Sequence, residues 1–328
     1  MHNTFMYNSD FNSMISVIIP FHKRFSILSL TIAELKRQSR DLSTALQVVV
    51  VDSNSDPHSL NRLSTQYKST SFYVDVLHVD NNVSVKRNHG ASFAKGSVLI
   101  FLDDDCVPQS NFIYYHVSSL RPGLIFSGQV KFDVSSSYSN FIRFRDFSEN
   151  RVNTHLNKFS VAAHHARSMN FSIYKSSWMD SSLSFDQLFR GYGWEDPVFF
   201  SQCIKKGLKI YSTEALVIHD DRTGLSNYRL KMRQLGQWYS RVLTNYPDLV
   251  ESLPLHYFAR LLPFIFVFSP FLILFGEFMF FLLLLTDKRP IFFSPYPFRL
   301  LSFIDFLIGY IQSSMFGVRY SYRDQPLS

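Results

Sequence analysis

The sequence predicts an α/β fold in which helices flank a mostly parallel sheet and hydrophobic helices extend the C-terminus. The first observation is that short apolar segments alternate with segments of helical apolar spacing between residues 14 and 105. Such alternation is typical of a parallel sheet with helices on both faces. The second observation is a change of composition after Leu253, where phenylalanine and leucine become dominant. A chain of 328 residues suits one large domain with an appended element.

The first part of the chain contains four short apolar runs that we interpret as buried strands. Pro57 directly after Asp56 marks the start of a helix, and Gly96 ends another. Ligands bind beyond the carboxyl ends of the strands in such sheets, so Pro20, Asp52 and the acids at 103–105 are expected near a site. The predicted strands are 15–20, 46–52, 72–80 and 97–105, and the predicted helices between them are 25–39, 55–67 and 83–96.

The region 120–225 has a mixed pattern. It predicts strands at 124–132, 166–174 and 208–220 and a helix at 194–207 that Gly207 ends. A basic helix rich in Gln and Arg is predicted at 226–248. The expected organisation is a tail (1–13), a catalytic domain (14–225, with halves 14–105 and 106–225) and a C-terminal region (226–328).

The hydrophobic C-terminal region contains two candidate membrane segments, 261–285 and 291–316. Each carries charge, because Glu277 lies in the first and Arg299 and Asp305 lie in the second. Three interpretations stay open: a helical hairpin in the membrane, helices in its interface, or a helical subdomain packed on the first domain. The basic residues of 226–248 suit anionic headgroups, which favours membrane lipids as partners and the cytoplasmic face as the location.

The net charge of +7 is compatible with nucleic acid, anionic lipid or a phosphorylated ligand. Nucleic acid is not expected, because the basic residues do not alternate with aromatic ones on one predicted face. The two cysteines, Cys106 and Cys203, provide neither a disulfide framework nor zinc-site spacing, which favours a reducing compartment. The polar first residues predict no secretory signal.

Three adjacent carboxylates, Asp103, Asp104 and Asp105, follow the fourth apolar run. Like charges so close raise each other's pKa unless a cation compensates. Carboxylate oxygens suit Mg²⁺ or Mn²⁺. Because strand side chains alternate, we expect Asp103 and Asp105 to point the same way and Asp104 to point elsewhere. The alternative is a solvated acidic turn.

Three further groups carry potential chemistry. In "GYGWEDPVFF" (191–200), Glu195 and Asp196 open a helix whose dipole favours the charged form, so one of them could act as a general base. The alternative is an ordinary acidic first turn. His219 ends an apolar strand and is either a metal ligand or a structural histidine. Lys86 and Arg87 could face a diphosphate or simply lie on a solvated helix face.

Together these segments resemble glycosyltransferase family 2, which has the GT-A fold. The resemblance rests on "SVIIPFHKR", "VVVVDSNSD", "VKRNHGASFAKG", "SVLIFLDDDCVP" and "GYGWEDPVF" followed by His219, and covers roughly residues 14–225. "GYGWED" is also similar to the "GWGGED" segment of galactosyltransferase-type relatives. One departure is Asp52-Ser53-Asn54-Ser55, where the family usually has "DDGS" or "DNxS".

The resemblance implies a role for each matching residue. Asp103 and Asp105 would form the DxD pair that holds Mn²⁺ or Mg²⁺, with His219 as a further ligand. Asp196 would deprotonate the acceptor, Glu195 would hold the acceptor or donor sugar, and Trp194 would stack on a sugar face. The donor-binding residues would be Pro20, Phe21, Asp52, Arg87, Asp103 and Asp104.

The function implied is a membrane-associated, metal-dependent, inverting glycosyltransferase. Its donor would be a UDP-hexose or UDP-N-acetylhexosamine, and its acceptor a glycan or polyprenyl-linked glycan in surface polysaccharide synthesis. A sugar nucleotidyltransferase is one alternative, although "PFHKRFS" lacks the glycines of a phosphate loop. A non-catalytic, membrane-associated nucleotide-sugar-binding module is the other, and the intact acidic residues argue against it.

Overall fold

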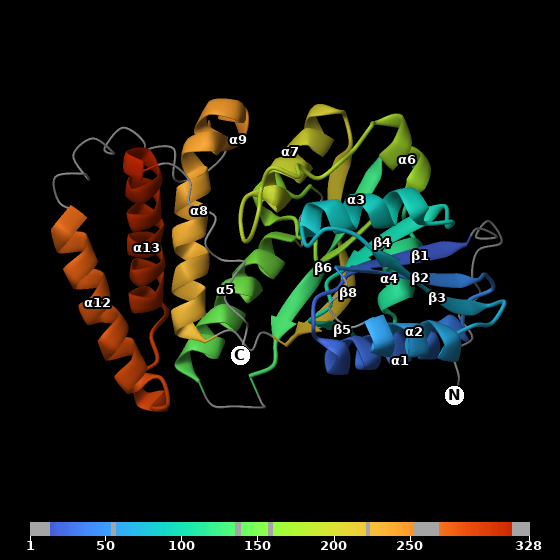
Figure 1. Cartoon of the computed structure of the whole chain (residues 1–328), viewed down its shortest axis with the longest axis horizontal. Helices are drawn as coiled ribbons and strands as arrows, with labels where there is room; N and C mark the ends of the chain where they lie inside the picture. The colour runs from blue at the N-terminus through green and yellow to red at the C-terminus, as the bar shows by residue number, and fades with distance from the viewer. Residues whose placement is uncertain are drawn as a thin grey trace.

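The computed structural model describes residues 14–53, 57–134, 139–156, 160–220, 224–251 and 269–316. Its centre is an eight-stranded sheet of order β3-β2-β1-β4-β7-β6-β8-β5 (Figure 1). The first four strands in this order pair in parallel, as the alternating sequence pattern predicts. They are β1 (Ile15–Pro20), β2 (Leu46–Asp52), β3 (Phe72–His78) and β4 (Val98–Leu102).

The second half of the sheet is mixed rather than parallel. β7 (Asn170–Tyr174) runs antiparallel to both β4 and β6 (Leu124–Phe132). β8 (Lys209–His219) is parallel to β6 and antiparallel to the short β5 (Cys106–Pro108). The β5–β8 pairing sets Cys106 opposite His219, which brings the turn after β4 against the end of β8.

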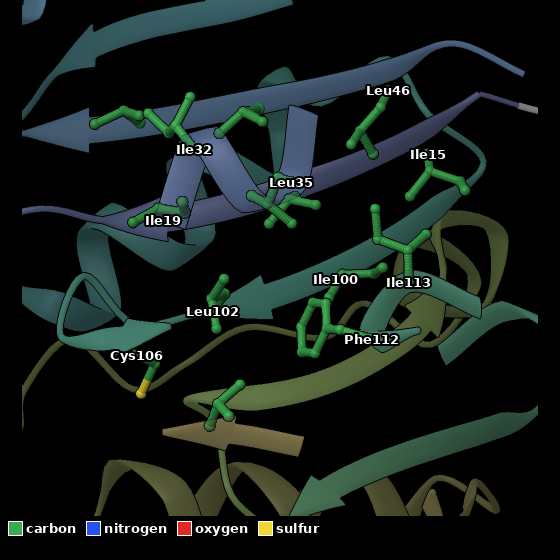
Figure 2. Packing of buried hydrophobic residues seen from close by; sticks show 14 of the residues in the cluster. Ile15, Ile19, Ile32, Leu35, Leu46, Ile100, Leu102, Cys106, Phe112 and Ile113 are labelled. Carbon is green, nitrogen blue, oxygen red and sulfur yellow. The ribbon is translucent and has the colours of Figure 1, made fainter. Parts of the chain in front are cut away.

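Two hydrophobic cores lie on the two faces of the sheet. One lies under α1 (Phe25–Ser39), α2 (Pro57–Gln66) and α4 (Phe112–Val117), and Figure 2 shows part of it. The other lies under α3 (Val83–Phe93), α6 (Lys175–Asp180) and α7 (Glu195–Lys205). Both faces of β1, β2 and β4 are therefore buried, which explains their continuous apolar runs.

The remaining described helices gather beside the sheet. α8 (Leu225–Asn245), α13 (Pro295–Phe316) and α12 (Ser269–Thr286) lie side by side, with α12 outermost (Figure 1). α5 (Asn140–Leu156) lies between them and the sheet, and α9 (Pro247–Glu251) follows α8. Two short 3-10 helices are Ala163–His165 and Pro290–Phe292.

The two acids of the hydrophobic region, Glu277 and Asp305, are paired with arginines of α8. Arg229 of α8 donates to Asp305 of α13 at 2.8 Å and to Glu277 of α12 at 2.8 and 2.9 Å. Arg233 joins the same two acids at 2.8 and 3.1 Å. Because each charge has an opposite partner, Glu277 and Asp305 are compatible with apolar helices.

The bundle bears on the three open interpretations of the hydrophobic region. Among the described residues, α12 alone is long and apolar enough to cross a membrane, with mean hydropathy 2.0. The second predicted segment instead forms α13, whose buried face packs on α8, as the subdomain interpretation expects. The start of the first segment, 261–268, lies outside the described residues, as do 1–13 and the motif residues 54 and 55.

Several element boundaries differ from the sequence-based predictions. The fourth strand ends at Leu102, so the acids at 103–105 form a turn instead of extending the strand. The seventh strand begins at Asn170 rather than at 166. Three elements, β5, α4 and α5, are not predicted from the sequence. β5 is too short to show a periodic pattern, and the polar residues of α5 obscure its apolar face.

Candidate active site

A cavity of about 860 Å³ opens between the sheet and the helical bundle. Its lining brings together residues that the sequence separates widely. The acidic turn after β4, the first turn of α7 and the last residue of β8 meet there, and α5, α8 and α13 complete the wall. Of the predicted site residues, the cavity is lined by Arg87, Asp103, Asp105, Trp194, Glu195, Asp196 and His219.

Two arginines, Arg24 and Arg87, contact the three adjacent carboxylates. Asp103 pairs with Arg87 at 2.9 Å. Asp104 accepts a hydrogen bond from the His22 amide at 2.6 Å and one from Arg24 at 2.8 Å. Asp105 lies 2.9 Å from Arg24. Asp103 and Asp105 line the cavity whereas Asp104 does not, which agrees with the expected division of the triplet.

Burial and charge act differently on neighbouring members of this triplet. Burial, together with the nearby Asp105 carboxylate, raises the pKa of Asp104 to about 7, despite opposition from Arg24. Burial also acts to raise the pKa of Asp105, but His219, Arg24 and Lys231 outweigh it and lower that pKa. Asp105 is therefore the member of this pair that stays ionised most readily, as a metal ligand must.

Asp105 and His219 form the part of the cavity with metal-ligand character. Asp105 Oδ2 lies 3.1 Å from His219 Nε2. Adjacent ligands of an octahedral ion with bonds of 2.0–2.1 Å are about 3 Å apart, so this separation fits Mg²⁺ or Mn²⁺. Arg24 shares the same Asp105 oxygen, so a bound cation and Arg24 would compete for it.

Cys106 completes a group whose ligand atoms lie within 4.8 Å of one another. Its thiol is fully buried in the core under α1, as Figure 2 shows, and burial raises the thiol pKa well above its ordinary value. A carboxylate and an imidazole are therefore the fitting donors. Asp103, the other predicted ligand, lies outside this group and is held by Arg87.

The acidic start of α7 lies near this turn, because Arg87 contacts both Asp103 and Asp196. Asp196 accepts hydrogen bonds from the Ser168 amide at 3.1 Å and from the Ser168 hydroxyl. Arg87 lies 3.4 Å from the same carboxylate. These contacts fix the orientation of the Asp196 carboxylate.

Glu195, the other acid at the start of α7, has a raised pKa. Burial and the adjacent Asp196 charge raise its pKa to about 7. Its Oε2 atom is buried and has no hydrogen-bond partner in the described part of the chain. A carboxyl group of this kind can accept or donate a hydrogen bond to a ligand hydroxyl near neutral pH.

The remaining predicted residues are either largely buried at the edge of the cavity or lie outside it. Trp194 is 6 % exposed, stacks on Tyr239 and donates its indole N–H to the Leu235 carbonyl at 2.9 Å, which leaves little ring face for a sugar. Pro20, Phe21 and Asp52 end or follow β1 and β2 but do not line the cavity. The Phe21 side chain belongs to the core under α1.

Two residues that hold the acids of the site, Arg24 and Ser168, are not predicted from the sequence. Arg24 belongs to "PFHKRF", directly after the first strand, and its position at a carboxyl end was an available signal. Ser168 precedes β7 in an irregular segment, and no motif distinguishes it. Its contact with Asp196 arises only because β7 pairs with β4.

Comparison with known proteins defines the class. Residues 16–178 match the family described as "Glycosyl transferase family 2". This match to a glycosyltransferase family covers just under half of the chain. The matched segment includes Arg87 and the acidic triplet and ends before Glu195. No curated protein sequence matches the chain.

Two solved structures resemble the chain in fold. The mannosyltransferase PcManGT from Pyrobaculum calidifontis, in complex with GDP-Man and Mn²⁺, has a TM-score of 0.61 at 16 % identity, covering 94 % of this chain and 89 % of its own. GalNAc-T7 with UDP, GalNAc and Mn²⁺ has a TM-score of 0.51 at 17 % identity, over 73 % of this chain. That match covers 50 % of GalNAc-T7, so this chain spans about half of its length. The fold is GT-A, as the sequence predicts.

Proposed function

We propose that this protein transfers a sugar from a nucleoside-diphosphate sugar to a glycan or lipid-linked glycan acceptor, with inversion at the anomeric carbon. One observation carries the proposal: metal-ligand candidates and a proton-acceptor candidate line the same cavity, and Arg87 contacts both groups. A direct displacement needs these two functions on opposite sides of one reacting carbon.

The proposed metal is Mn²⁺ or Mg²⁺, held by Asp105 and His219, with Asp103 as a further ligand. Such a cation supplies positive charge that offsets the charge of the leaving diphosphate. The 3.1 Å separation of Asp105 and His219 supports this assignment. Mn²⁺ is present in both PcManGT and GalNAc-T7 as described above.

For the donor, a UDP-sugar is the preference drawn from the sequence resemblance, including the Gly191–Asp196 segment. GDP-Man is the alternative that PcManGT suggests. We assign Arg87 to the diphosphate side, and Pro20, Phe21 and Asp52 to the nucleoside side, since they lie at or after the carboxyl ends of β1 and β2.

We assign the general base to Asp196. Ser168 orients its carboxylate and Arg87 stabilises its charge, and the ionised oxygen accepts the proton of the acceptor hydroxyl as that oxygen attacks. Glu195 is assigned to binding a sugar hydroxyl through its unpartnered oxygen. If Glu195 is the base instead, the substitutions described in the Discussion distinguish the two.

Membrane association at the cytoplasmic face is a further part of the proposal. The outward side of α12 exposes large apolar residues, including Phe271, Leu274, Phe278 and Phe281 at 56–72 %. Exposed apolar surface of this extent indicates an interaction site. A membrane-bound acceptor, as used in surface polysaccharide synthesis, would bring its sugar to such a surface.

The test is thermal stability of the full-length protein with UDP, GDP, CDP or dTDP and the corresponding nucleotide sugars, each with and without Mn²⁺. We expect one nucleotide to raise the melting temperature only when Mn²⁺ is present. If a folded sample responds to none of them, the proposed donor site is wrong. A nucleotidyltransferase would instead consume a nucleoside triphosphate and a sugar phosphate and release pyrophosphate.

A further inference from the structure

One face of α12 carries a continuous stripe of exposed apolar side chains. Its members recur at the three- and four-residue spacing that places residues on one face of a helix. Their exposed fractions are 56–72 %, and apolar residues on both flanks of the stripe are exposed at 39–48 %. The stripe consists of Phe271, Leu274, Phe278, Phe281 and Leu285, and its flanks contain Ile273, Phe275, Leu282 and Leu284.

The breadth of this apolar surface indicates a lipid surface rather than a second copy of the chain. Where two helices pair through such a stripe, charged residues typically flank it. The flanks of α12 are instead apolar, and its only charged residue, Glu277, is held by arginines of α8. Exposed Ile291, Phe292 and Tyr296 add apolar surface after α12, next to the exposed Arg289. Apolar side chains beside a cation match the acyl chains and anionic headgroups of a membrane.

The middle of α12 is attached to the rest of the protein. Glu277 accepts hydrogen bonds from Arg229 at 2.8 and 2.9 Å and from Arg233 at 3.1 Å. At the neighbouring Gly276 the helix packs closely on α13, because a methyl group there would lie 3.0 Å from a side-chain carbon of Ile304. If α12 moved away from α8 and α13, the Glu277 carboxylate would lose these partners.

The end of α12 is attached as well, at the start of α5. The Asp287 carboxylate accepts hydrogen bonds from the Ser139 hydroxyl and the Phe141 amide, both at 2.9 Å. Asn140 donates its side-chain amide to the Thr286 carbonyl at 2.8 Å. α5 in turn packs along β6 of the sheet. The end of α12 is therefore held next to the domain that contains the cavity.

These attachments are incompatible with a bundle in which α12 crosses a bilayer. α8 runs beside α13, and α13 beside α12 (Figure 1), so a membrane crossed by α12 would also surround α8. α8 is not among the helices apolar enough to cross a membrane, and charged side chains in the hydrocarbon region are costly. The basic residues of α8 are Arg229, Lys231, Arg233 and Arg241.

We propose that α12 lies in the plane of one membrane leaflet, with the stripe from Phe271 to Leu285 among the acyl chains, and does not cross the bilayer. Both ends of α12 then stay on the side of the membrane where the cavity lies. The proposal rests on the membrane association in the proposed function and specifies how the helix is oriented in the lipid. It depends on neither the donor nor the reaction.

The test is labelling of single cysteines with a membrane-impermeant maleimide, on sealed membrane vesicles of one orientation from cells that express the full-length protein. The native Cys106 and Cys203 are fully buried and should give little background. Ser269→Cys and Arg289→Cys mark the two ends of α12. Asp248→Cys marks the side of the membrane where α9 lies. We expect the same fraction of all these variants to be labelled before the vesicles are dissolved.

Phe278→Cys supplies a second readout, because an in-plane helix would place this position among the acyl chains. We expect it to be labelled only after the vesicles are dissolved in SDS. The matched control is Met179→Cys on α6, since Met179 is 57 % exposed and Phe278 is 56 % exposed. Met179→Cys should be labelled before the vesicles are dissolved.

Three outcomes overturn the proposal. If Ser269→Cys or Arg289→Cys is protected while the other is labelled like Asp248→Cys, α12 crosses the bilayer. If Phe278→Cys is labelled as readily as Met179→Cys, the stripe does not contact lipid. Disulfide-linked dimers of Phe278→Cys under mild oxidation would assign the stripe to a second copy of the chain. Metal-dependent nucleotide binding measured on the same samples reports separately on the proposed sugar transfer.

Discussion

The carboxylates of Asp103 and Asp196 share one buried guanidinium. Arg87 lies 2.9 Å from Asp103 and 3.4 Å from Asp196, and its guanidinium carbon lies 5.1 Å from the centre of the Phe185 ring. A single cation thus pairs with both an acid of the proposed donor site and the proposed base. A change of charge at either carboxylate should change the electrostatic interaction of the other with Arg87, because the shared arginine is buried.

Asp196→Asn should retain metal-dependent nucleotide binding and lose sugar transfer by about 10²–10⁴-fold, the usual contribution of a general base. The measurement is steady-state transfer together with nucleotide affinity. Ser168→Ala should cause a smaller loss, because it removes the hydroxyl that orients Asp196 but leaves the carboxylate. If Asp196→Asn keeps most of its turnover and Glu195→Gln does not, Glu195 is the base.

Asp105→Asn should weaken Mn²⁺-dependent nucleotide binding by at least about tenfold, because an amide oxygen cannot replace the charge of a carboxylate ligand. Calorimetric titration of UDP or GDP with and without Mn²⁺ measures the effect. Asp248→Asn is the control, since Asp248 is an exposed acid on α9 and does not line the cavity. Unchanged affinity in Asp105→Asn would remove Asp105 from the metal site.

Glu195 predicts a pH dependence of stability in the metal-free protein. Its pKa is about 7 when folded, against an ordinary value of 4.5, so between these values the folded protein holds more protons than the unfolded chain. The free energy of unfolding should therefore fall as pH rises through this window. Asp104, whose pKa is also raised to about 7, contributes with the same sign.

Urea denaturation in EDTA at about pH 5 and about pH 8 measures this dependence. In Glu195→Gln, the decrease in unfolding free energy between the two pH values should be smaller than in the unmodified protein, with the contribution of Asp104 remaining. The same decrease in both proteins would show that Glu195 does not titrate in this range.

Gly236→Ala should destabilise the bundle by about 1–3 kcal/mol or more, the usual cost of overpacking. A methyl group at Gly236 would overlap the carbonyl oxygen of Phe306, because the backbones of α8 and α13 touch there. Urea denaturation measures the cost. Gly224→Ala is the control, since a methyl group there meets nothing within 4 Å. Equal stability of the two variants would contradict this packing.

Replacing Phe278 and Phe281 together by Asp should weaken binding to lipid vesicles by about tenfold or more, since each buried Phe contributes about 1.5–3 kcal/mol. Both are more than half exposed on α12, so the fold should be unaffected. Vesicle co-sedimentation measures the effect, with Met179→Asp, at an exposed site on α6, as the control. Undiminished sedimentation would show that α12 is not the membrane contact. Deleting the bundle is a poorer test, because removal of α13 would expose the α8 core residues Trp238 and Tyr239.

The local sequence was sufficient for the parallel half of the sheet. Continuous apolar runs predict strands buried on both faces, and β1, β2 and β4 have such runs. Because strands of this kind end together at one edge, the same pattern predicted that the acids at 103–105 lie at a site. The acidic motif at the start of α7 and the position of His219 predicted further residues of the cavity. β5 and α5 were missed, because their patterns are short or masked by polar residues.

The local sequence therefore predicts the fold class, the glycosyltransferase resemblance and most of the cavity's acidic residues. The tertiary structure decided which partner each of those acids takes: Arg24 for Asp104, Arg87 for Asp103, His219 for Asp105 and Ser168 for Asp196. It also decided that α13 packs against α8 and lines the cavity, whereas large apolar residues of α12 stay exposed. The reason is physical. Periodicity records which face of an element is buried, whereas side chains in turns take their directions from long-range packing that no local pattern encodes.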